Sequence, residues 1–241
     1  MAKIITVSSY KGGVGKTTII TAAAEILASR GYRSLIIDLD SNCTVSRCYN
    51  KLFQDITSKN LLSETVTDFK GVYPAKESID IIPSCLENHL LNNIMDMQLK
   101  INLQKTGLKE KYDYILIDPP GHWCAHTRNA VFASDVLILP GTCSSLDFSA
   151  IKLYFDILQN CCIEADTYVC INKANSKTNE PGIIEKYNAA FGDFLIPGSI
   201  PDIKSLKRLT ENVNYPLHQA VKNRLEQYID FFIKGDTSCL N

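Results

Sequence analysis

The chain has 241 residues, of which 45% are hydrophobic and 21% are charged, and its formal net charge is −1. This composition is that of an ordinary globular domain with a substantial core, and the near-neutral charge excludes a general attraction to nucleic acid, so any such contact needs a local basic patch. Neither a long apolar run nor a signal-peptide pattern occurs, and we therefore expect a cytoplasmic protein.

The predicted elements alternate between strands and helices along the chain. In chain order they are strand Lys3–Ser9, helix Lys16–Arg30, strand Arg33–Asp38, helix Asn42–Phe53, strand Ser78–Ser84, helix Leu86–Leu103, strand Tyr112–Asp118, helix Thr127–Ala133, strand Asp135–Pro140, helix Ser145–Gln159, strand Thr167–Asn172, helix Pro181–Phe191, strand Leu195–Ile200, and helices Lys204–Thr210 and Leu217–Lys234. The polar stretch Gln54–Lys70 has no assigned form. This alternation predicts an α/β fold, a doubly wound, mostly parallel sheet flanked by helices, as one domain over residues 1–241.

A glycine-rich turn follows the first predicted strand and opens the first predicted helix. Its glycines let the backbone approach an anion, and the helix N-terminus adds a partial positive charge. Lys16 can reach the β- and γ-phosphates of a nucleotide, and the Thr17 hydroxyl can bind Mg²⁺. The usual phosphate-loop pattern has a glycine at position 10, where this chain has Tyr10. The expected nucleotide-binding residues of this loop are Lys11, Gly12, Gly13, Val14, Gly15, Lys16, Thr17 and Thr18.

Aspartates end two further predicted strands. Asp118 follows the apolar run Ile115-Leu116-Ile117, a Walker B pattern whose aspartate is expected to hold Mg²⁺ together with Thr17. The second predicted strand ends in Asp38-Leu39-Asp40. Because the carboxyl ends of parallel strands face the ligand crevice, these carboxylates are predicted to lie beside the glycine-rich turn.

The run Lys-Gly-Gly-Val-Gly-Lys-Thr-Thr at 11–18 resembles the deviant Walker A box of the ParA/MinD family of P-loop ATPases, of the SIMIBI class. No helix-turn-helix segment precedes it, as in the short, Soj-like ParA branch. The resemblance implies a Mg²⁺-dependent ATP hydrolase in which Lys11 reaches the nucleotide of a second subunit. It also implies that Asp40 activates the attacking water, while Lys11 and Lys16 neutralise charge.

Two motifs depart from the family pattern. The run Asp38-Leu39-Asp40-Ser41-Asn42 keeps both aspartates but lacks the Pro-Gln that usually follows them. The run Asp118-Pro119-Pro120-Gly121 differs from the usual Asp-Thr-Pro-Pro or Asp-Cys-Pro-Pro. The second departure affects the expected path of the loop that follows Asp118, which is the switch loop of the family. It does not affect the expected metal role of Asp118.

The resemblance also implies contacts with adenine and with DNA. Asn172 lies at the expected base-contacting position, and Pro201 in the loop expected to close over adenine. A locally basic C-terminal region is expected to supply salt-dependent, sequence-independent phosphate contacts, although Asp202 lies near a position where relatives often carry arginine. The candidate DNA-binding residues are Lys204, Lys207, Arg208, Lys222 and Arg224. A solvated helix face remains the alternative for this basic region.

The family's biology adds expected partners. The resemblance implies an ATP-dependent homodimer that binds non-specific DNA and is nucleoid-associated in the cytoplasm. A ParB-type or other small adaptor protein would stimulate slow hydrolysis, and the cargo would be a plasmid, a chromosome origin or an organelle such as a carboxysome.

Three other functions stay open at this point. A MinD-like membrane ATPase needs a basic amphipathic C-terminal helix, but the tail from Lys234 is short and polar, and the aromatics Tyr228, Phe231 and Phe232 are expected to pack on the core, so no membrane contact is expected. A redox or metal-cluster protein could use Cys124. The remaining alternative is a small-molecule ligase such as a dethiobiotin synthetase.

The other cysteines point to no particular site. Metal or redox sites are one interpretation of the pairs Cys43 and Cys48, and Cys161 and Cys162. We expect instead that these residues are small buried hydrophobic side chains in a reducing cytosol.

Overall fold

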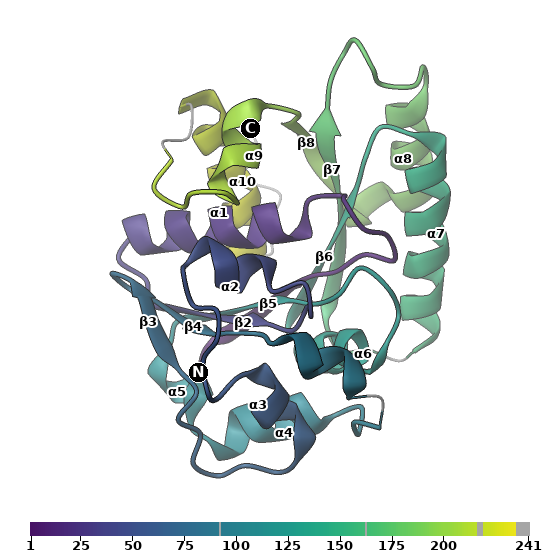
Figure 1. Cartoon of the computed structure of the whole chain (residues 1–241). Coiled ribbons are helices and arrows are strands. Elements are labelled where there is room, and N and C mark those ends of the chain that lie inside the picture. Colours follow the sequence, from purple (N-terminus) through teal and green to yellow (C-terminus); the bar gives the residue numbers. More distant parts are fainter. Residues whose placement is uncertain (92, 162, 216–218, 235–241) are drawn as a thin grey trace.

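Eight strands form one sheet in the order β3-β4-β2-β5-β1-β6-β7-β8, which confirms the predicted α/β fold (Figure 1). The computed structural model describes residues 1–91, 93–161, 163–215 and 219–234. The strands are β1 (Lys3–Val7), β2 (Ser34–Asp38), β3 (Tyr73–Lys76), β4 (Ile79–Ile82), β5 (Tyr114–Asp118), β6 (Val136–Gly141), β7 (Asp166–Ala174) and β8 (Leu195–Pro201). Neighbouring strands pair in parallel, except that β3 pairs with β4 in the antiparallel sense.

Helices cover both faces of the sheet. They are α1 (Lys16–Ser29), α2 (Thr44–Cys48), α3 (Ser58–Ser63), α4 (Gln98–Lys105), α5 (Leu108–Lys111), α6 (Ala125–Ala133), α7 (Ser145–Asn160), α8 (Ile183–Phe191), α9 (Lys204–Leu209) and α10 (Gln219–Lys234), with 3-10 turns η1 (Leu86–Leu90) and η2 (Gly192–Phe194). Helices α1, α2, α9 and α10 pack on one face, while α3 to α8 lie on the other (Figure 1).

The central strands are apolar on both faces because each face is covered by helices. Alternate residues of one strand enter different cores: Ile5 and Val7 of β1 contribute to the α1 side, while Ile4 packs with the α4 and α6 side. This burial fixes the register of the strands, so the carboxyl ends of β1, β2 and β5 come together at one edge. Asp38 and Asp118 are direct register partners there.

The region between β2 and β5 differs most from the predicted elements. The predicted helix Asn42–Phe53 is wrong beyond α2, because Asn50 and Phe53 adopt left-handed backbone angles (φ 54° and 60°) that end it. The stretch Gln54–Lys70, for which the sequence predicts no secondary structure, contains α3. Strand β3 was not predicted and pairs as an edge with β4.

The predicted helix Leu86–Leu103 is also wrong, because η1 and α4 are separate elements. The side chain of Asn129 sets the start of α4: its Oδ1 accepts from the Leu99 N–H at 2.9 Å, and its Nδ2 donates to the Met95 carbonyl at 3.1 Å. A residue on α6, distant in sequence, therefore decides where this helix begins. The predicted last helix corresponds to α10, and its first two predicted residues lie outside the described ones.

Candidate nucleotide-binding site

The glycine-rich turn connects β1 to α1 and places the helix N-terminus behind a shallow backbone cradle. Gly13 and Gly15 have positive φ angles of 80° and 100°, which residues with a Cβ rarely adopt. A Cβ on Gly15 would also lie 2.2 Å from Nδ2 of Asn172. The backbone of this loop is therefore available to an anion only because glycine occupies these positions, as expected for a phosphate cradle.

Lys16 lies within the cradle and is almost completely buried. Its Nζ lies 3.4 Å from Oγ of Ser9. Burial lowers the pKa of Lys16 from its ordinary value, and the nearby charges of Asp118 and Asp40 oppose that effect. The buried ammonium group thus faces the acidic strand ends and has few partners of its own, which suits it to bind phosphate oxygens.

The loop after β5 lies directly on the cradle. A Cβ on Gly121 would lie 3.0 Å from Nζ of Lys16 and 3.1 Å from the backbone nitrogen of Gly12. Gly121 is part of a departure from the family pattern, and the sequence alone assigns it no role. Its missing side chain is what lets this loop approach Lys16 so closely, and a glycine after two prolines was the only signal in the sequence.

Asp118 and Thr17 lie side by side, and their oxygen atoms could bind a cation. Oγ1 of Thr17 donates to Oδ2 of Asp118 at 2.7 Å, whereas the other carboxylate oxygen, Oδ1, is buried without a hydrogen-bond partner. Burial raises the pKa of Asp118 to about 7, although Lys16 and the Thr17 hydroxyl oppose this. An unpaired buried oxygen beside a hydroxyl fits the oxygen-rich shell that Mg²⁺ prefers.

The two aspartates that follow β2 have different surroundings. Asp38 is completely buried, and its carboxylate accepts from the Ser46 N–H at 2.9 Å, the Ser46 hydroxyl at 2.7 Å and the Asp40 N–H at 3.1 Å. Burial, followed by the charge of Asp118, raises the pKa of Asp38 to about 8. Asp40 is partly exposed, and its Oδ1 accepts from the Asn42 N–H at 2.9 Å. Asp38 therefore shapes the site, while Asp40 is open to water.

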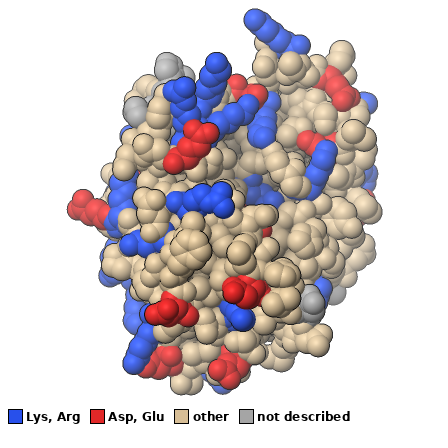
Figure 2. Space-filling view, viewed as in Figure 1, with Lys and Arg blue, Asp and Glu red and all other residues tan. Residues whose placement is uncertain are grey.

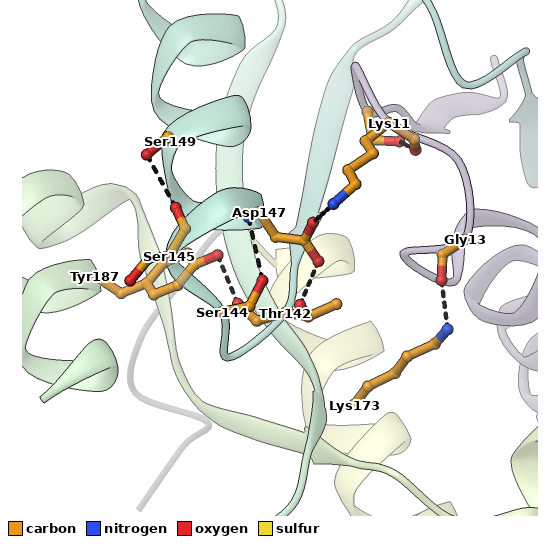
Figure 3. A network of polar contacts seen from close by, with 10 residues as sticks. Lys11, Gly13, Thr142, Ser144, Ser145, Asp147, Ser149, Lys173 and Tyr187 are labelled. Atoms are coloured by element: carbon orange, nitrogen blue, oxygen red, sulfur yellow. Dashed lines mark hydrogen bonds and ion pairs between the residues drawn. The ribbon is translucent and has the colours of Figure 1, made fainter. Parts of the chain in front are cut away.

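Lys11 points away from the cradle that contains Lys16. Its Nζ forms an ion pair with Oδ1 of Asp147, in the first turn of α7 (Figure 3). Lys173 approaches from β7 instead, and its Nζ donates to the carbonyl oxygen of Gly13. The contacts of Asp147 and Lys173 with the loop are not predictable from the sequence, because nothing local to either residue indicates them.

The two residues predicted to contact adenine lie at adjoining strand ends. Asn172 is buried on β7, where its Nδ2 donates to the Val14 carbonyl at 2.7 Å and its Oδ1 has no partner. Pro201 ends β8 in register with Ala174. Asn172 therefore anchors the glycine-rich loop through the Val14 carbonyl. Contact of Asn172 and Pro201 with adenine stays a prediction.

Most of the candidate DNA-binding residues have partners within the chain. Figure 2 shows Lys and Arg gathered over the region of α9 and α10, with acidic side chains among them. The contacts are Lys207 with Asp202 at 3.0 Å, Arg208 with the Tyr215 hydroxyl at 2.8 Å, Lys222 with Glu226 at 3.9 Å and Arg224 with Gln227 at 3.0 Å. Lys204 is exposed at the start of α9. DNA binding by this surface stays a prediction.

The structure also bears on the competing functions. Among residues 1–91, 93–161, 163–215 and 219–234, no group of three or more His, Cys, Asp or Glu could hold a metal ion, and no helix there has the length and apolar character to cross a bilayer. Cys43, Cys48, Cys124 and Cys161 are free thiols, while Cys162 lies outside the described residues. Tyr228 and Phe231 are buried as expected, whereas the tail 235–241 lies outside the described residues.

Comparisons with known proteins agree with this geometry. A family model described as an AAA domain matches residues 2–165. The chain is 33% identical over 160 residues to the sporulation initiation inhibitor protein Soj of Bacillus subtilis, covering 59% of each chain. It is 27% identical over 205 residues to the cell division protein PomZ of Myxococcus xanthus, covering 78% of this chain and 63% of that protein. It thus spans less than two thirds of the length of either relative.

A solved structure shares the whole fold. It is a candidate plasmid partition protein of Borrelia burgdorferi B31 bound to AMPPNP, which superposes with a TM-score of 0.83 at 24% identity and covers 98% of this chain and 100% of that one. The match of the family model, the similarity to Soj and the two-lysine loop on this fold lead to one conclusion. The chain belongs to the ParA/MinD family of P-loop proteins.

Proposed function

We propose that this chain is a ParA-type positioning ATPase. ATP would join two copies face to face, the dimer would bind non-specific DNA of the nucleoid, and a ParB-type or other small adaptor would stimulate hydrolysis to release a cargo. The observation that carries this proposal is the separation of the two loop lysines. Lys16 is buried in the cradle, whereas the Lys11 side chain is half exposed and is directed away from the cradle, to Asp147.

The residues around the cradle suit phosphoryl transfer. Backbone N–H groups of the loop and Lys16 would bind the β- and γ-phosphate oxygens, which are the groups that gain charge in the transition state. Asp40, held by the Asn42 N–H and open to solvent, would accept a hydrogen bond from the attacking water and orient it. Lys11 of a second copy would add positive charge from outside.

A divalent cation fits beside these groups. Thr17 and Asp118 would hold Mg²⁺, directly or through water, because a buried Asp118 oxygen lacks a partner there. When bound, Mg²⁺ would neutralise charge on the phosphate oxygens. The rest of the proposed chemistry is positioning by the chain's own side chains and backbone.

The relatives support a positioning role more than another P-loop chemistry. Soj, PomZ and the Borrelia burgdorferi protein are named for sporulation control, cell division and plasmid partition respectively. The basic residues on α9 and α10 would supply the DNA contacts. Their present partners, such as Asp202 for Lys207, are exposed enough for phosphates to replace them at modest cost.

One set of variants tests this function. With ATP, Mg²⁺ and low salt, the wild-type chain should hydrolyse ATP slowly and retain duplex DNA, and raising the salt concentration should abolish retention. Asp40→Ala should lose hydrolysis but still retain DNA. Lys207→Glu with Arg208→Glu should lose DNA retention while still hydrolysing ATP, and Lys152→Glu with Lys186→Glu is the charge-matched control. Normal hydrolysis by Asp40→Ala, or unchanged DNA affinity of the Lys207/Arg208 variant, would contradict the proposal.

A further inference from the structure

A cavity of about 90 Å³ lies beside the candidate nucleotide site, between the loop after β2 and the loop after β5. The residues on either side of Asp40 line it from the first loop, and those on either side of Gly121 line it from the second. Gly121 is also the residue that approaches Lys16, since a Cβ there would lie 3.0 Å from its Nζ. The cavity is therefore separated from the place of the γ-phosphate only by these two loops.

His126 lines this cavity and has an unused hydrogen-bonding atom. It is the second residue of α6, its side chain is only 5% exposed, and its Nε2 is buried with no hydrogen-bond partner. Burial, followed by the neighbouring His122, lowers the pKa of His126 to about 4, although the charge of Asp40 opposes this. The ring is therefore uncharged at physiological pH, and its Nε2–H tautomer has one donor to offer. A water or a ligand in the cavity can supply the missing partner.

The N-terminus of α6 lies at the same cavity. Cys124, the N-cap residue, and Ala125 line it beside His126. No side chain caps this helix end, and its first turn contains no acidic residue. The first N–H groups of a helix lack intrahelical partners and carry a partial positive charge, so they favour an anion. Within the described part of the chain no three His, Cys, Asp or Glu side chains could hold a metal ion, so the ligand that these donors fit is an oxyanion.

The size and the edge of the cavity suit a small ion that comes and goes. About 90 Å³ is room for several waters or for one phosphate. Asn88 lines the cavity from a buried position, where its Nδ2 donates to the Ser84 hydroxyl at 2.7 Å. His89 and His122, which also line it, are exposed to solvent. An ion bound there would thus lie between the active-site loops and water.

We propose that this cavity receives the inorganic phosphate that ATP hydrolysis releases, and that Nε2 of His126 donates to one of the phosphate oxygens. This inference rests on the proposed ATP hydrolysis. Hydrolysis adds water to the transferred phosphoryl group, so the product is hydrogen phosphate, which keeps a P–OH group. That group can donate to a carboxylate, so the nearby charge of Asp40 does not exclude the ion. A neutral donor holds phosphate more weakly than a cation would, as a product on its way to solvent requires.

The first test measures phosphate binding without hydrolysis. The full chain is saturated with AMPPNP and Mg²⁺, so that the cradle is filled, and inorganic phosphate is then titrated in a calorimeter. We expect saturable binding by the wild type, about tenfold weaker binding by His126→Leu, and retained binding by His126→Gln, whose amide can donate near the Nε2 position. Ser34→Ala should bind like the wild type. It is the matched control, because Oγ of Ser34 is also buried without a partner but lies at the other end of β2, away from the cavity. No binding by the wild type, or equal affinity of the wild type and His126→Leu, overturns the proposal.

The second test uses turnover and needs no variant for its main result. Phosphate bound in the cradle competes with ATP, whereas phosphate in the cavity binds beside the nucleotide and blocks the release of the next product. Added phosphate should therefore inhibit steady-state hydrolysis by the wild type non-competitively with ATP, and purely competitive inhibition or none overturns the proposal. The inhibition constant should rise about tenfold in His126→Leu and stay near the wild-type value in His126→Gln and Ser34→Ala. If the wild type does not hydrolyse ATP, the proposed function fails, while the calorimetric result still decides whether the cavity binds phosphate.

Discussion

Replacing Asn172 by alanine should destabilise the phosphate cradle, because the glycine-rich loop then loses a hydrogen bond that anchors it to β7. The Asn172 side chain is buried, and its Nδ2 donates to the Val14 carbonyl at 2.7 Å. Without it, that carbonyl would remain buried with no donor, at a cost of about 1–3 kcal/mol. We therefore expect the nucleotide-free protein to lose about 2 kcal/mol of unfolding free energy. Because binding must then reorder the loop, affinity for a triphosphate should fall by up to about 30-fold.

Two ligands separate this role from contact with the base. Calorimetric titration with ATP and with inorganic tripolyphosphate, both with Mg²⁺, should show a similar loss for Asn172→Ala, since both ligands use the cradle. Asn188→Ala, an exposed asparagine on α8 whose Nδ2 donates to Ile184 at 3.1 Å, is the matched control. If ATP binding weakens but tripolyphosphate binding and nucleotide-free stability do not change, Asn172 acts at the adenine and the reasoning is refuted.

Two further predictions concern the acidic strand ends. Thr17→Val removes the hydroxyl beside Asp118 and should reduce the Mg²⁺-dependent gain in nucleotide affinity about tenfold or more, measured with Mg²⁺ against EDTA; an unchanged gain would argue against this metal site. Burial raises the pKa of Asp38 to about 8, so the native state keeps a proton that the unfolded state releases near pH 4. Stability of the nucleotide-free protein should therefore fall as pH rises from about 4 to 8, by up to about 1.4 kcal/mol per pH unit for this group. Asp38→Asn should reduce that slope in urea unfolding at pH 5 to 8, and the remaining slope comes from Asp118, whose pKa burial raises to about 7. A wild-type slope in the variant would count against the assignment.

Local pattern was sufficient for every strand of the described sheet except the edge strand β3, and it was insufficient for the short connecting helices. The apolar runs ending at Asp38 and Asp118 identified β2 and β5 because strands covered on both faces must be apolar throughout. The helix predicted at Asn42–Phe53 failed because left-handed residues interrupt it. Asn50 belongs to a residue type that favours this conformation, whereas nothing about Phe53 marks it. The start of α4 depends on Asn129 of α6, which a local pattern cannot include.

The sequence by itself determined the phosphate loop, its two lysines and the acidic residues at the neighbouring strand ends. These features are short and local, and parallel strands bring their carboxyl ends to one edge of the sheet whatever the details of packing. The order of the strands then made Asp38 and Asp118 neighbours.

Only the tertiary structure decided what each lysine and the loop contact. Lys11 meets Asp147 across 136 residues, and Asn172 meets Val14 across 158. Gly121 owes its importance to the close approach of Lys16. Such pairs depend on how α7, β7 and the loop after β5 pack around β1, and that packing is set by the burial of side chains elsewhere in the chain.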